Sequence, residues 1–323
     1  MEYRRLGHTD LTVSRACLGA MTFGSQTGEA DAARMVDLAV ERGVNFFDTA
    51  NVYNCGRSEE MLGAILKGRR DRVILASKVR NKTGDGRDDA GLSCAAIRKA
   101  IEQSLRRLQT DYLDIYYLHA PDWSVPIEET LEAMDEVVRA GKVRYPATSN
   151  YAGWQVAQMF AIAERGGARP PYISQPMYNL LARGIEQEYL AMCRAFGVST
   201  VVYNPLAGGL LTGKQRRERP LPGTRFDENK LYLDRYWHPA YFDAVDRLGA
   251  IARASGRSLV EFALSWLLRH TPIDCVLLGA SKVEQLAQNL DAVESSQPLS
   301  PEALTAIEGV WADLRGVTPK YNR

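Results

Sequence analysis

The sequence predicts one closed barrel of eight parallel strands alternating with eight helices, spanning residues 1–323 as a single α/β domain. Short apolar, β-branched runs alternate eight times with longer amphipathic stretches, which is the pattern of parallel strand–helix–strand units. No linker rich in Pro, Gly and Ser divides the chain. Because an open doubly wound sheet seldom reaches eight such regular units, the closed barrel is favoured over it.

Each unit can be placed on the chain. We expect strands at 15–20, 44–49, 72–78, 112–119, 142–149, 171–176, 198–205 and 274–281. We expect helices at 29–42, 58–67, 92–108, 127–140, 153–165, 185–196, 258–270 and 283–292. Three segments lie outside this repeat: a β-hairpin at 1–13 with a turn near 7–10, a long loop at 207–239, and an extra helix at 301–314. The long loop is either a clamp over the site or a disordered segment.

Composition sets the class of protein. Of the 323 residues, 46% are hydrophobic and 24% are charged, which provides ample material for a packed core. The net charge of +1 gives no argument for binding nucleic acid or an anionic membrane. The start lacks the apolar core of a signal peptide and no apolar run reaches membrane-spanning length, so we expect a cytoplasmic protein.

The five cysteines point to neither disulfides nor a metal site. They lie far apart, without a C-x-x-C pair or a nearby histidine, so we expect reduced thiols and no bound metal. Cys55 lies in the loop after the second strand, where a bystander role is favoured over that of a nucleophile or redox sensor.

The site of such a barrel lies at the carboxyl ends of its strands. The polar residues expected there are Asp48, Lys78, His119, Ser149, Asn150, Gln175 and Tyr203, and Tyr53 follows Asp48 within one short loop. Each has an ordinary structural explanation when taken singly. Together they bring an acid, an amine, a phenol and an imidazole to one mouth of the barrel, which chance seldom does.

Proton delivery to a carbonyl oxygen, as hydride reaches its carbon, requires such a set. Tyr53 would be the acid. Because an unperturbed phenol has a pKa of about 10, a nearby cation is needed to stabilise the phenolate that forms, and Lys78 would supply that charge. Asp48 would pair with Lys78 and aim it. His119 would donate a hydrogen bond to the carbonyl.

Seven motifs follow one another in order along nearly the whole chain: "GVNFFDTANVYNCGRSEEMLGAIL", "ASKV", "DYLDIYYLHAPD", "TSNY", "SQPMYNLL", "VVYNPLAGGLLTGK" and "GASKVEQLAQNL". By these the chain resembles the aldo-keto reductases. Within that superfamily, "GRSE" and "PLAGGLLTGK" are most similar to the branch of bacterial general reductases and potassium-channel β subunits. The resemblance implies NADPH-dependent reduction of aldehydes or ketones to alcohols, with the catalytic set on Asp48, Tyr53, Lys78 and His119.

The resemblance also implies which residues bind the cofactor. By it, Ser149, Asn150 and Gln175 hold the nicotinamide carboxamide, and Tyr203 stacks on the nicotinamide ring. The segment from 204 to 214, "NPLAGGLLTGK", would cover the pyrophosphate as a strap, shaped by Pro205, Leu206, Gly208 and Leu210, with Lys214 adding charge. Arg225 matches a later basic position of the branch.

The adenosine end falls on the last strand–helix unit. Gly279 leads from the strand into this unit, and Lys282 follows Ser281 with a full charge. Ser281, Gln285 and Asn289 match positions that approach the adenosine half, although Gln285 stands where many relatives have an arginine. The free amides at the helix start and the charge of Lys282 suit the 2′-phosphate, and "GASK" holds no repelling acid. We therefore expect NADP(H) to be favoured over NAD(H).

Aromatic residues in the loops are candidates for the substrate pocket. They are Phe23, Trp123, Trp154, Tyr236 and Trp237. Such a set suits a flat apolar substrate or the apolar face of a sugar, and ordinary loop packing is the alternative for each. The substrate itself and the oligomeric state are left open by the sequence.

Other functions compete with this one. "GGLLTGKQ" nearly matches a phosphate-binding P-loop but has Gln215 where a hydroxyl is required, and no G-x-G-x-x-G opens a Rossmann unit. A redox-sensing regulatory subunit, in which bound nucleotide reports redox state and turnover is slow and incidental, stays open as the alternative.

Overall fold

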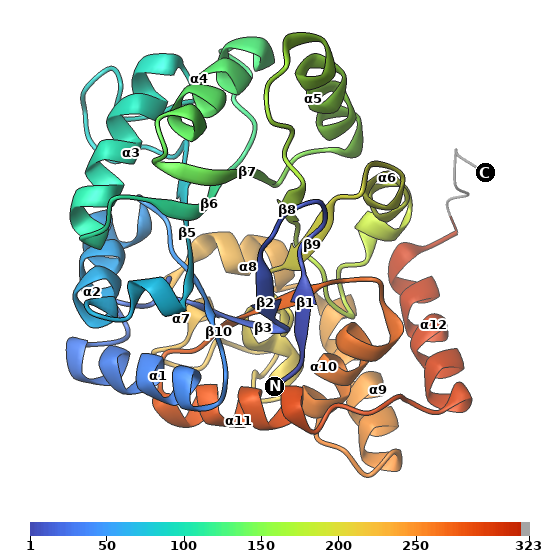
Figure 1. Ribbon diagram of the computed structural model, residues 1–323. Coiled ribbons are helices and arrows are strands. Elements are labelled where there is room, and N and C mark those ends of the chain that lie inside the picture. The colour runs from blue at the N-terminus through green and yellow to red at the C-terminus, as the bar shows by residue number, and fades with distance from the viewer. Residues whose placement is uncertain (318–323) are drawn as a thin grey trace.

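The structure, a computed structural model, describes residues 1–317 and has the predicted fold. Eight parallel strands close into a barrel in the order β10-β3-β4-β5-β6-β7-β8-β9, with helices around it (Figure 1). The barrel strands are β3 Ala16–Gly19, β4 Phe46–Asp48, β5 Ile74–Val79, β6 Leu113–Leu118, β7 Val143–Ser149, β8 Ile173–Gln175, β9 Ser199–Val202 and β10 Cys275–Gly279. Every one of them lies within or next to a segment predicted as a strand.

An antiparallel hairpin closes one end of the barrel. It consists of β1 Tyr3–Arg5 and β2 Thr12–Ser14, joined by the predicted turn. Its buried residues Leu6, Leu11 and Val13 pack with the apolar side chains of the barrel interior. Since the hairpin blocks this end, the interior is open only at the carboxyl ends of the strands.

The helices around the barrel follow the predicted order. They are α1 Glu29–Glu41, α2 Arg57–Leu66, α3 Cys94–Leu108, α4 Ile127–Arg139, α5 Gly153–Gly166, α6 Tyr189–Phe196, α10 Leu259–His270 and α11 Val283–Glu294, with α12 Pro301–Arg315 as the extra helix. Side chains fix several helix starts: Ser93 accepts a hydrogen bond from the amide of Ala96, and Ser258 forms a capping box with Glu261.

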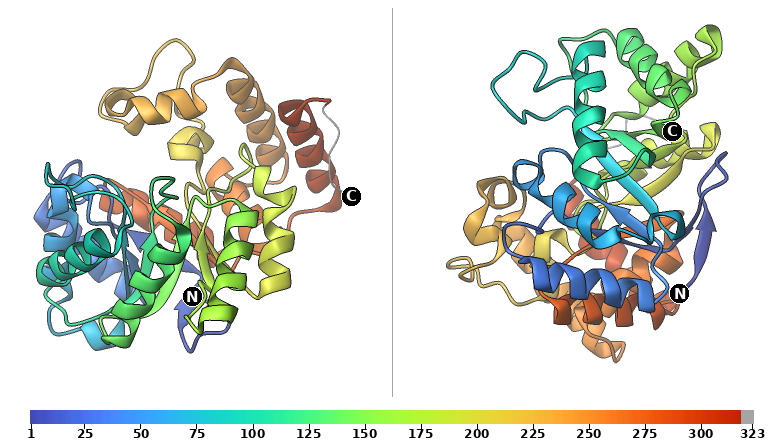
Figure 2. Two further views of the ribbon diagram at one scale, coloured as in Figure 1. Left: turned by 90° about the horizontal axis from the view of Figure 1, so that it is seen from above. Right: turned by 60° about the vertical axis from the view of Figure 1, so that its left-hand side comes forward.

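The segment after β9 is more helical than predicted. It holds the short helices α7 Arg225–Glu228 and α8 Lys230–Tyr236, and the long helix α9 Pro239–Ala254 follows it. Helix α9 was not predicted, although Pro239 stands in its first turn and its buried residues Phe242, Val245 and Leu248 recur at helical spacing. Figure 2 (left) shows that α7 and α8 lie at the end of the barrel opposite the hairpin.

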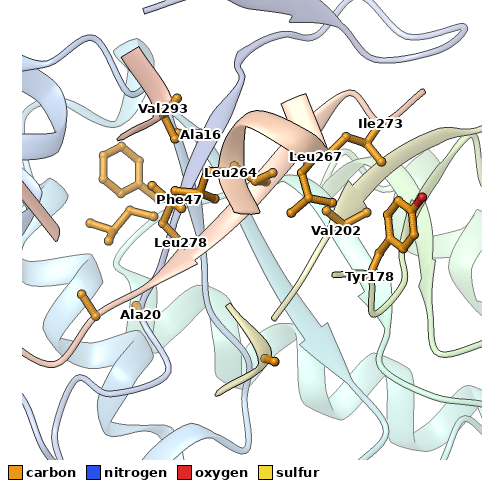
Figure 3. Close-up of a cluster of buried hydrophobic side chains, with 14 of the residues drawn as sticks. Ala16, Ala20, Phe47, Tyr178, Val202, Leu264, Leu267, Ile273, Leu278 and Val293 are labelled. Atoms are coloured by element: carbon orange, nitrogen blue, oxygen red, sulfur yellow. The ribbon is translucent and has the colours of Figure 1, made fainter. Parts of the chain in front are cut away.

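The apolar core has two parts because side chains alternate along each strand. Outward-facing residues such as Val202 and Leu278 pack against the helices, as Figure 3 shows for Leu264 and Leu267 of α10. Inward-facing residues, including Cys17, Phe46, Ala76, Ile115, Tyr117, Ala147, Ile173, Val201 and Cys275, fill the interior. Within residues 1–317, no helix is both long enough and apolar enough to cross a membrane.

Candidate active site at the carboxyl ends of the strands

The polar residues of the site continue the inward-facing rows of the barrel. Asp48 lies two residues beyond the interior residue Phe46, and Lys78 two beyond Ala76. His119, Ser149, Gln175 and Tyr203 stand in the same relation to Tyr117, Ala147, Ile173 and Val201. A strand repeats its orientation every two residues, so one polar layer caps an apolar interior. This layer forms the floor of a cavity of about 590 Å³.

A buried ion pair lies at the base of this layer. The Lys78 ammonium donates to Asp48 Oδ1 and to the carbonyl oxygen of Thr49, the latter at 2.9 Å, and both charged side chains are almost fully buried. Gln175 Nε2 donates to the other oxygen, Asp48 Oδ2, at 2.8 Å. Burial opposes the charge on Lys78, but the carboxylate of Asp48 outweighs it and raises the pKa of Lys78. Lys78 is therefore a cation at neutral pH.

Tyr53 lies over this pair. Lys78 Nζ is 5.1 Å from the centroid of the Tyr53 ring. Burial raises the pKa of the Tyr53 phenol, although the charge of Lys78 opposes the rise. The phenol thus keeps its proton at neutral pH, next to a cation that would stabilise the phenolate.

The loop that carries Tyr53 has an unusual backbone. Asn54, Cys55 and Gly56 have φ values of 51°, 56° and 88°, so three successive residues are left-handed. At Gly56 a Cβ atom would also lie 2.9 Å from the Arg107 side chain, so glycine is required there. Asn54 Nδ2 ties the loop to the carbonyl oxygens of Met21 and Phe23 at 2.9 and 2.7 Å.

The start of helix α2 is anchored beneath this loop by two residues that sequence reasoning did not single out. Ser58 Oγ donates to the carbonyl oxygen of Ala20 at 2.7 Å. The fully buried Glu59 accepts from Ser77 Oγ and, at 2.7 Å, from Arg107 Nε. Because Ser77 precedes Lys78, this network links the tyrosine loop to the lysine strand.

His119 lies beside Tyr53 at the cavity floor. The two rings meet edge to face with centroids 5.7 Å apart. Burial, reinforced by the positive charges of Lys78 and Arg80, lowers the pKa of His119 to about 3. The imidazole is therefore neutral across the physiological range and has a single N–H to donate.

Four further predicted residues meet at the same end of the cavity. Ser149 Oγ donates to the carbonyl oxygen of Gln175 at 2.9 Å, and Asn150 Nδ2 donates to Ser149 Oγ at 3.0 Å. Tyr203 Oη donates to Asn150 Oδ1 at 2.7 Å. All four line the cavity, so the structure brings hydroxyl, amide and aromatic groups together next to Tyr53 and His119.

The segment after β9 forms one wall. Pro205, Leu206 and Gly208 line the cavity, whereas Leu210 is buried beneath them. Gly208 has a φ of 68°, and a Cβ atom there would lie 2.6 Å from the Tyr232 ring. Gly208 thus permits helix α8 to pack against the segment after β9.

Basic residues gather farther along the same cavity. Lys214 and Arg225 line it together with the exposed Lys282, the N-cap residue of α11. Gly279, Gln285 and Asn289 also lie in its wall. The amide and the hydroxyl of Ser281 both donate to Gln285 Oε1, at 3.0 and 3.2 Å. The predicted adenosine residues are therefore all in one cavity, continuous with the predicted catalytic residues.

The five predicted substrate residues lie apart from this cavity. Phe23 and Tyr236 are fully buried, and Trp237 packs between Phe226 and Phe242, so these three contribute to packing. Trp123 and Trp154 are 76% and 55% exposed, and their ring centroids lie 6.3 Å apart. None of the five is among the residues that line the cavity.

Several cavity residues were absent from the sequence prediction. They include Met21, Gln26, Asn81, Asn204, Leu231, Tyr232 and Arg235. Tyr232 is held by the segment around it, since its ring lies 4.9 Å from the Arg225 guanidinium and its hydroxyl donates to Asn204 Oδ1 at 3.3 Å. Among the described residues, no cluster of three or more His, Cys, Asp or Glu side chains has the arrangement of a metal site.

Known proteins are similar to this chain over nearly its whole length. The model of the aldo/keto reductase family matches residues 15–312. An uncharacterised oxidoreductase of Bacillus subtilis, YrpG, is 37% identical over 99% of both chains. A probable voltage-gated potassium channel subunit beta of Oryza sativa subsp. japonica is 34% identical over 99% of this chain and 100% of that protein. Aflatoxin B1 aldehyde reductase member 2 of Rattus norvegicus is 36% identical over 95% of this chain and 87% of that protein. The chain belongs to the aldo/keto reductase family.

Proposed function

We propose that this protein reduces aldehydes or ketones to alcohols with NADPH, with Tyr53 as the proton donor. One observation carries the proposal: the phenol of Tyr53 lies at the cavity floor with its ring 5.1 Å from the ammonium of a buried lysine that is itself paired with Asp48. A structural ion pair would not need a tyrosine on a strained loop above it. A proton donor that must become a phenolate needs this charge.

Each residue of the set has one role. Tyr53 stays protonated until it donates its proton to the carbonyl oxygen, because burial raises the pKa of the Tyr53 phenol. Lys78 stabilises the resulting phenolate, and Asp48 keeps Lys78 charged and fixed. His119, which is neutral, donates a hydrogen bond to the carbonyl oxygen and orients the substrate. A dihydronicotinamide cofactor, when bound, would supply the hydride.

The residues of the cavity fit a nicotinamide cofactor. A carboxamide offers two donor hydrogens and one acceptor oxygen, and the Ser149 hydroxyl with the amides of Asn150 and Gln175 can complement both. Tyr203 is the aromatic residue beside them and would lie against the ring. Lys214 would face the pyrophosphate.

We further propose that NADP(H) is favoured over NAD(H). The 2′-phosphate distinguishes the two cofactors, and Lys282, Arg225 and the start of α11 place positive charge and free amides at that end of the cavity. Gln285 would have to release the Ser281 amide and hydroxyl, which its side-chain oxygen now occupies. The positive charges of Lys282 and Arg225 are thus the main source of the preference for NADP(H).

A pair of lysine variants tests this preference. Lys282→Ala is expected to weaken NADPH binding by about tenfold, since a charged hydrogen-bonding group is lost, and to leave the Kd for NADH unchanged. Lys214→Ala is the matched control, because both cofactors share the pyrophosphate and both Kd values should rise together. Fluorescence titration with each cofactor measures them. Equal weakening of both cofactors by Lys282→Ala would remove Lys282 from the phosphate site.

The alternative function is that of a redox-sensing regulatory subunit, favoured by the likeness to the channel β subunit. The two functions differ in the number of turnovers. We expect sustained oxidation of NADPH, many cycles per site, with some members of a panel of aromatic aldehydes, ketones and sugars. If every compound of the panel gave only one oxidation of NADPH per site, followed by slow release of the nucleotide, the regulatory sensor would be favoured.

The reaction is proposed to take place in the cytoplasm, between the protein and a small carbonyl or alcohol. All five cysteines are unpaired thiols, three of them buried, which suits a reducing compartment.

A further inference from the structure

The residue beside His119 fixes which of its ring nitrogens carries the proton. Asn81 Nδ2 lies 3.3 Å from His119 Nδ1, and Asn81 lines the cavity. On its other side, Arg80 Nη1 donates to Asn81 Oδ1 at 3.3 Å. Because a guanidinium only donates, the amide oxygen must face Arg80, and the NH₂ group therefore faces the imidazole.

An amide NH₂ group has no lone pair to offer, so His119 Nδ1 must accept the hydrogen bond. A proton on Nδ1 would point at another donor. The single proton of the neutral ring consequently resides on Nε2. Among residues 1–317 the structure gives Nε2 no hydrogen-bond partner, so this N–H is available to a ligand in the cavity.

The backbone before Asn81 supports a functional role. Arg80 has a φ of 134°, a region that residues with a side chain rarely adopt and that strains the backbone. The Arg80 carbonyl oxygen is held by the amide of Gly91 at 2.8 Å. His119 is held independently, since its amide donates to Val79 at 2.9 Å and its carbonyl oxygen accepts from Asn150 Nδ2 at 2.9 Å. The strained turn brings Asn81 to a ring whose backbone is fixed.

We propose that Asn81 is a positioning residue that keeps the proton of His119 on Nε2, the nitrogen that donates to the oxygen of the bound carbonyl. Asn81 acts through His119 and delivers no proton itself. The catalytic part of this assignment rests on the proposed carbonyl reduction, whereas the tautomer is a property of the protein alone and can be measured without cofactor or substrate.

Nitrogen-15 NMR of the histidine rings tests the tautomer. The chain has only four histidines, so the ring signals of the protein labelled with ¹⁵N-histidine are few, and the His119→Gln variant identifies the signal that belongs to His119. We expect a neutral ring protonated on Nε2, unchanged from about pH 8 to pH 5, because the pKa of His119 is lowered to about 3.

Two substitutions of Asn81 should change this signal. In Asn81→Asp the carboxylate accepts from Nδ1, so a proton moves to Nδ1, and kcat for carbonyl reduction should fall about 100-fold, as for a lost oxyanion donor. In Asn81→Leu, which has a similar shape and no donor, both tautomers should be populated, and kcat should fall in proportion to the fraction of rings still protonated on Nε2, about twofold for an equal mixture. The Kd for NADPH should stay unchanged in both variants.

Lys82→Ala is the matched control in the same loop, because among residues 1–317 the exposed Lys82 side chain pairs only with Asp85. In this variant the tautomer of His119 and the kcat should equal those of the unmodified chain. A proton on Nδ1 in the unmodified chain, or an unaltered Nε2 tautomer in Asn81→Asp, would overturn the proposal. Absence of turnover in the unmodified chain would instead contradict the proposed function, and the NMR result would still decide what Asn81 does to His119.

Discussion

Tyr53→Phe is expected to lower kcat for carbonyl reduction by about 10³-fold or more, the upper part of the range for loss of a general acid. The substitution removes only the phenol oxygen, while the ring still packs against Lys78 and His119. The cavity keeps its shape, so the Kd for NADPH should stay within about twofold. Steady-state kinetics and fluorescence titration measure the two quantities.

Tyr116→Phe is the matched control for this substitution. Tyr116 lies on β6 with its side chain fully buried, and its hydroxyl has no hydrogen-bond partner among the described residues. Removing an unpartnered buried hydroxyl should cost neither activity nor stability. If Tyr53→Phe still reduced carbonyls at nearly the rate of the unmodified chain, Tyr53 would not be the proton donor.

The barrel and the polar layer of the site follow from short-range patterns, which explains why both were predicted from the sequence. The alternation of apolar runs and amphipathic stretches fixes the fold class. The ends of the runs fix Asp48, Lys78, Ser149 and Gln175, because a period of two residues carries the inward-facing row to the mouth of the barrel.

Contacts between distant segments were not predictable in this way. Glu59 reads in the sequence as one acid among several at a helix start, yet it is fully buried because Arg107, 48 residues later, reaches it. Asn81 likewise gains its role only from His119, which is 38 residues away. A single sequence shows neither the contact of Glu59 with Arg107 nor that of Asn81 with His119, so the roles of these residues become visible only in the structure.

The aromatic residues predicted for the substrate pocket show a different limit of prediction from sequence. Aromatic side chains in loops are equally suited to packing and to binding, and composition does not separate the two. In the structure Phe23 and Tyr236 are buried, and Trp237 packs between Phe226 and Phe242. For Tyr236 and Trp237 the reason is that helices α7 and α8 fold part of the segment that was predicted as one long loop at 207–239. Tyr232 on α8 lies in the cavity wall, one helical turn before Tyr236.

The second large effect is expected from Lys78→Met. The variant should lose about 10³-fold or more in kcat, because the phenolate of Tyr53 then forms without a cation beside it. It should also lose about 3–5 kcal/mol in the free energy of unfolding, because Asp48 is left as a buried carboxylate without its partner. Urea denaturation measures this loss.

A double variant separates the two effects of Lys78. Asp48→Asn combined with Lys78→Met replaces the buried ion pair by neutral groups of similar size, and such replacement is often neutral or stabilising. We expect the free energy of unfolding to return to within about 1 kcal/mol of that of the unmodified chain. Turnover should stay as low as in Lys78→Met, since neither Met nor Asn stabilises a phenolate. Recovery of turnover in the double variant would contradict the role of Lys78.

The pH dependence of the Lys78→Met variant identifies the buried carboxylate as the cause of its instability. Burial already raises the pKa of Asp48 in the presence of Lys78, and removal of that cation should raise it further. A carboxyl whose pKa is higher in the folded than in the unfolded chain stabilises the fold when it is protonated. This stabilisation is fully present below the pKa of the unfolded chain, about 3.9, and is lost as the pH rises through the pKa of the folded chain. The stability difference between Lys78→Met and the double variant should therefore be largest at neutral pH and shrink as the pH falls toward 4. Urea denaturation of both variants from pH 8 to pH 4 measures this difference, and a difference that does not change with pH would show that lost packing, rather than the unpaired charge of Asp48, destabilises Lys78→Met.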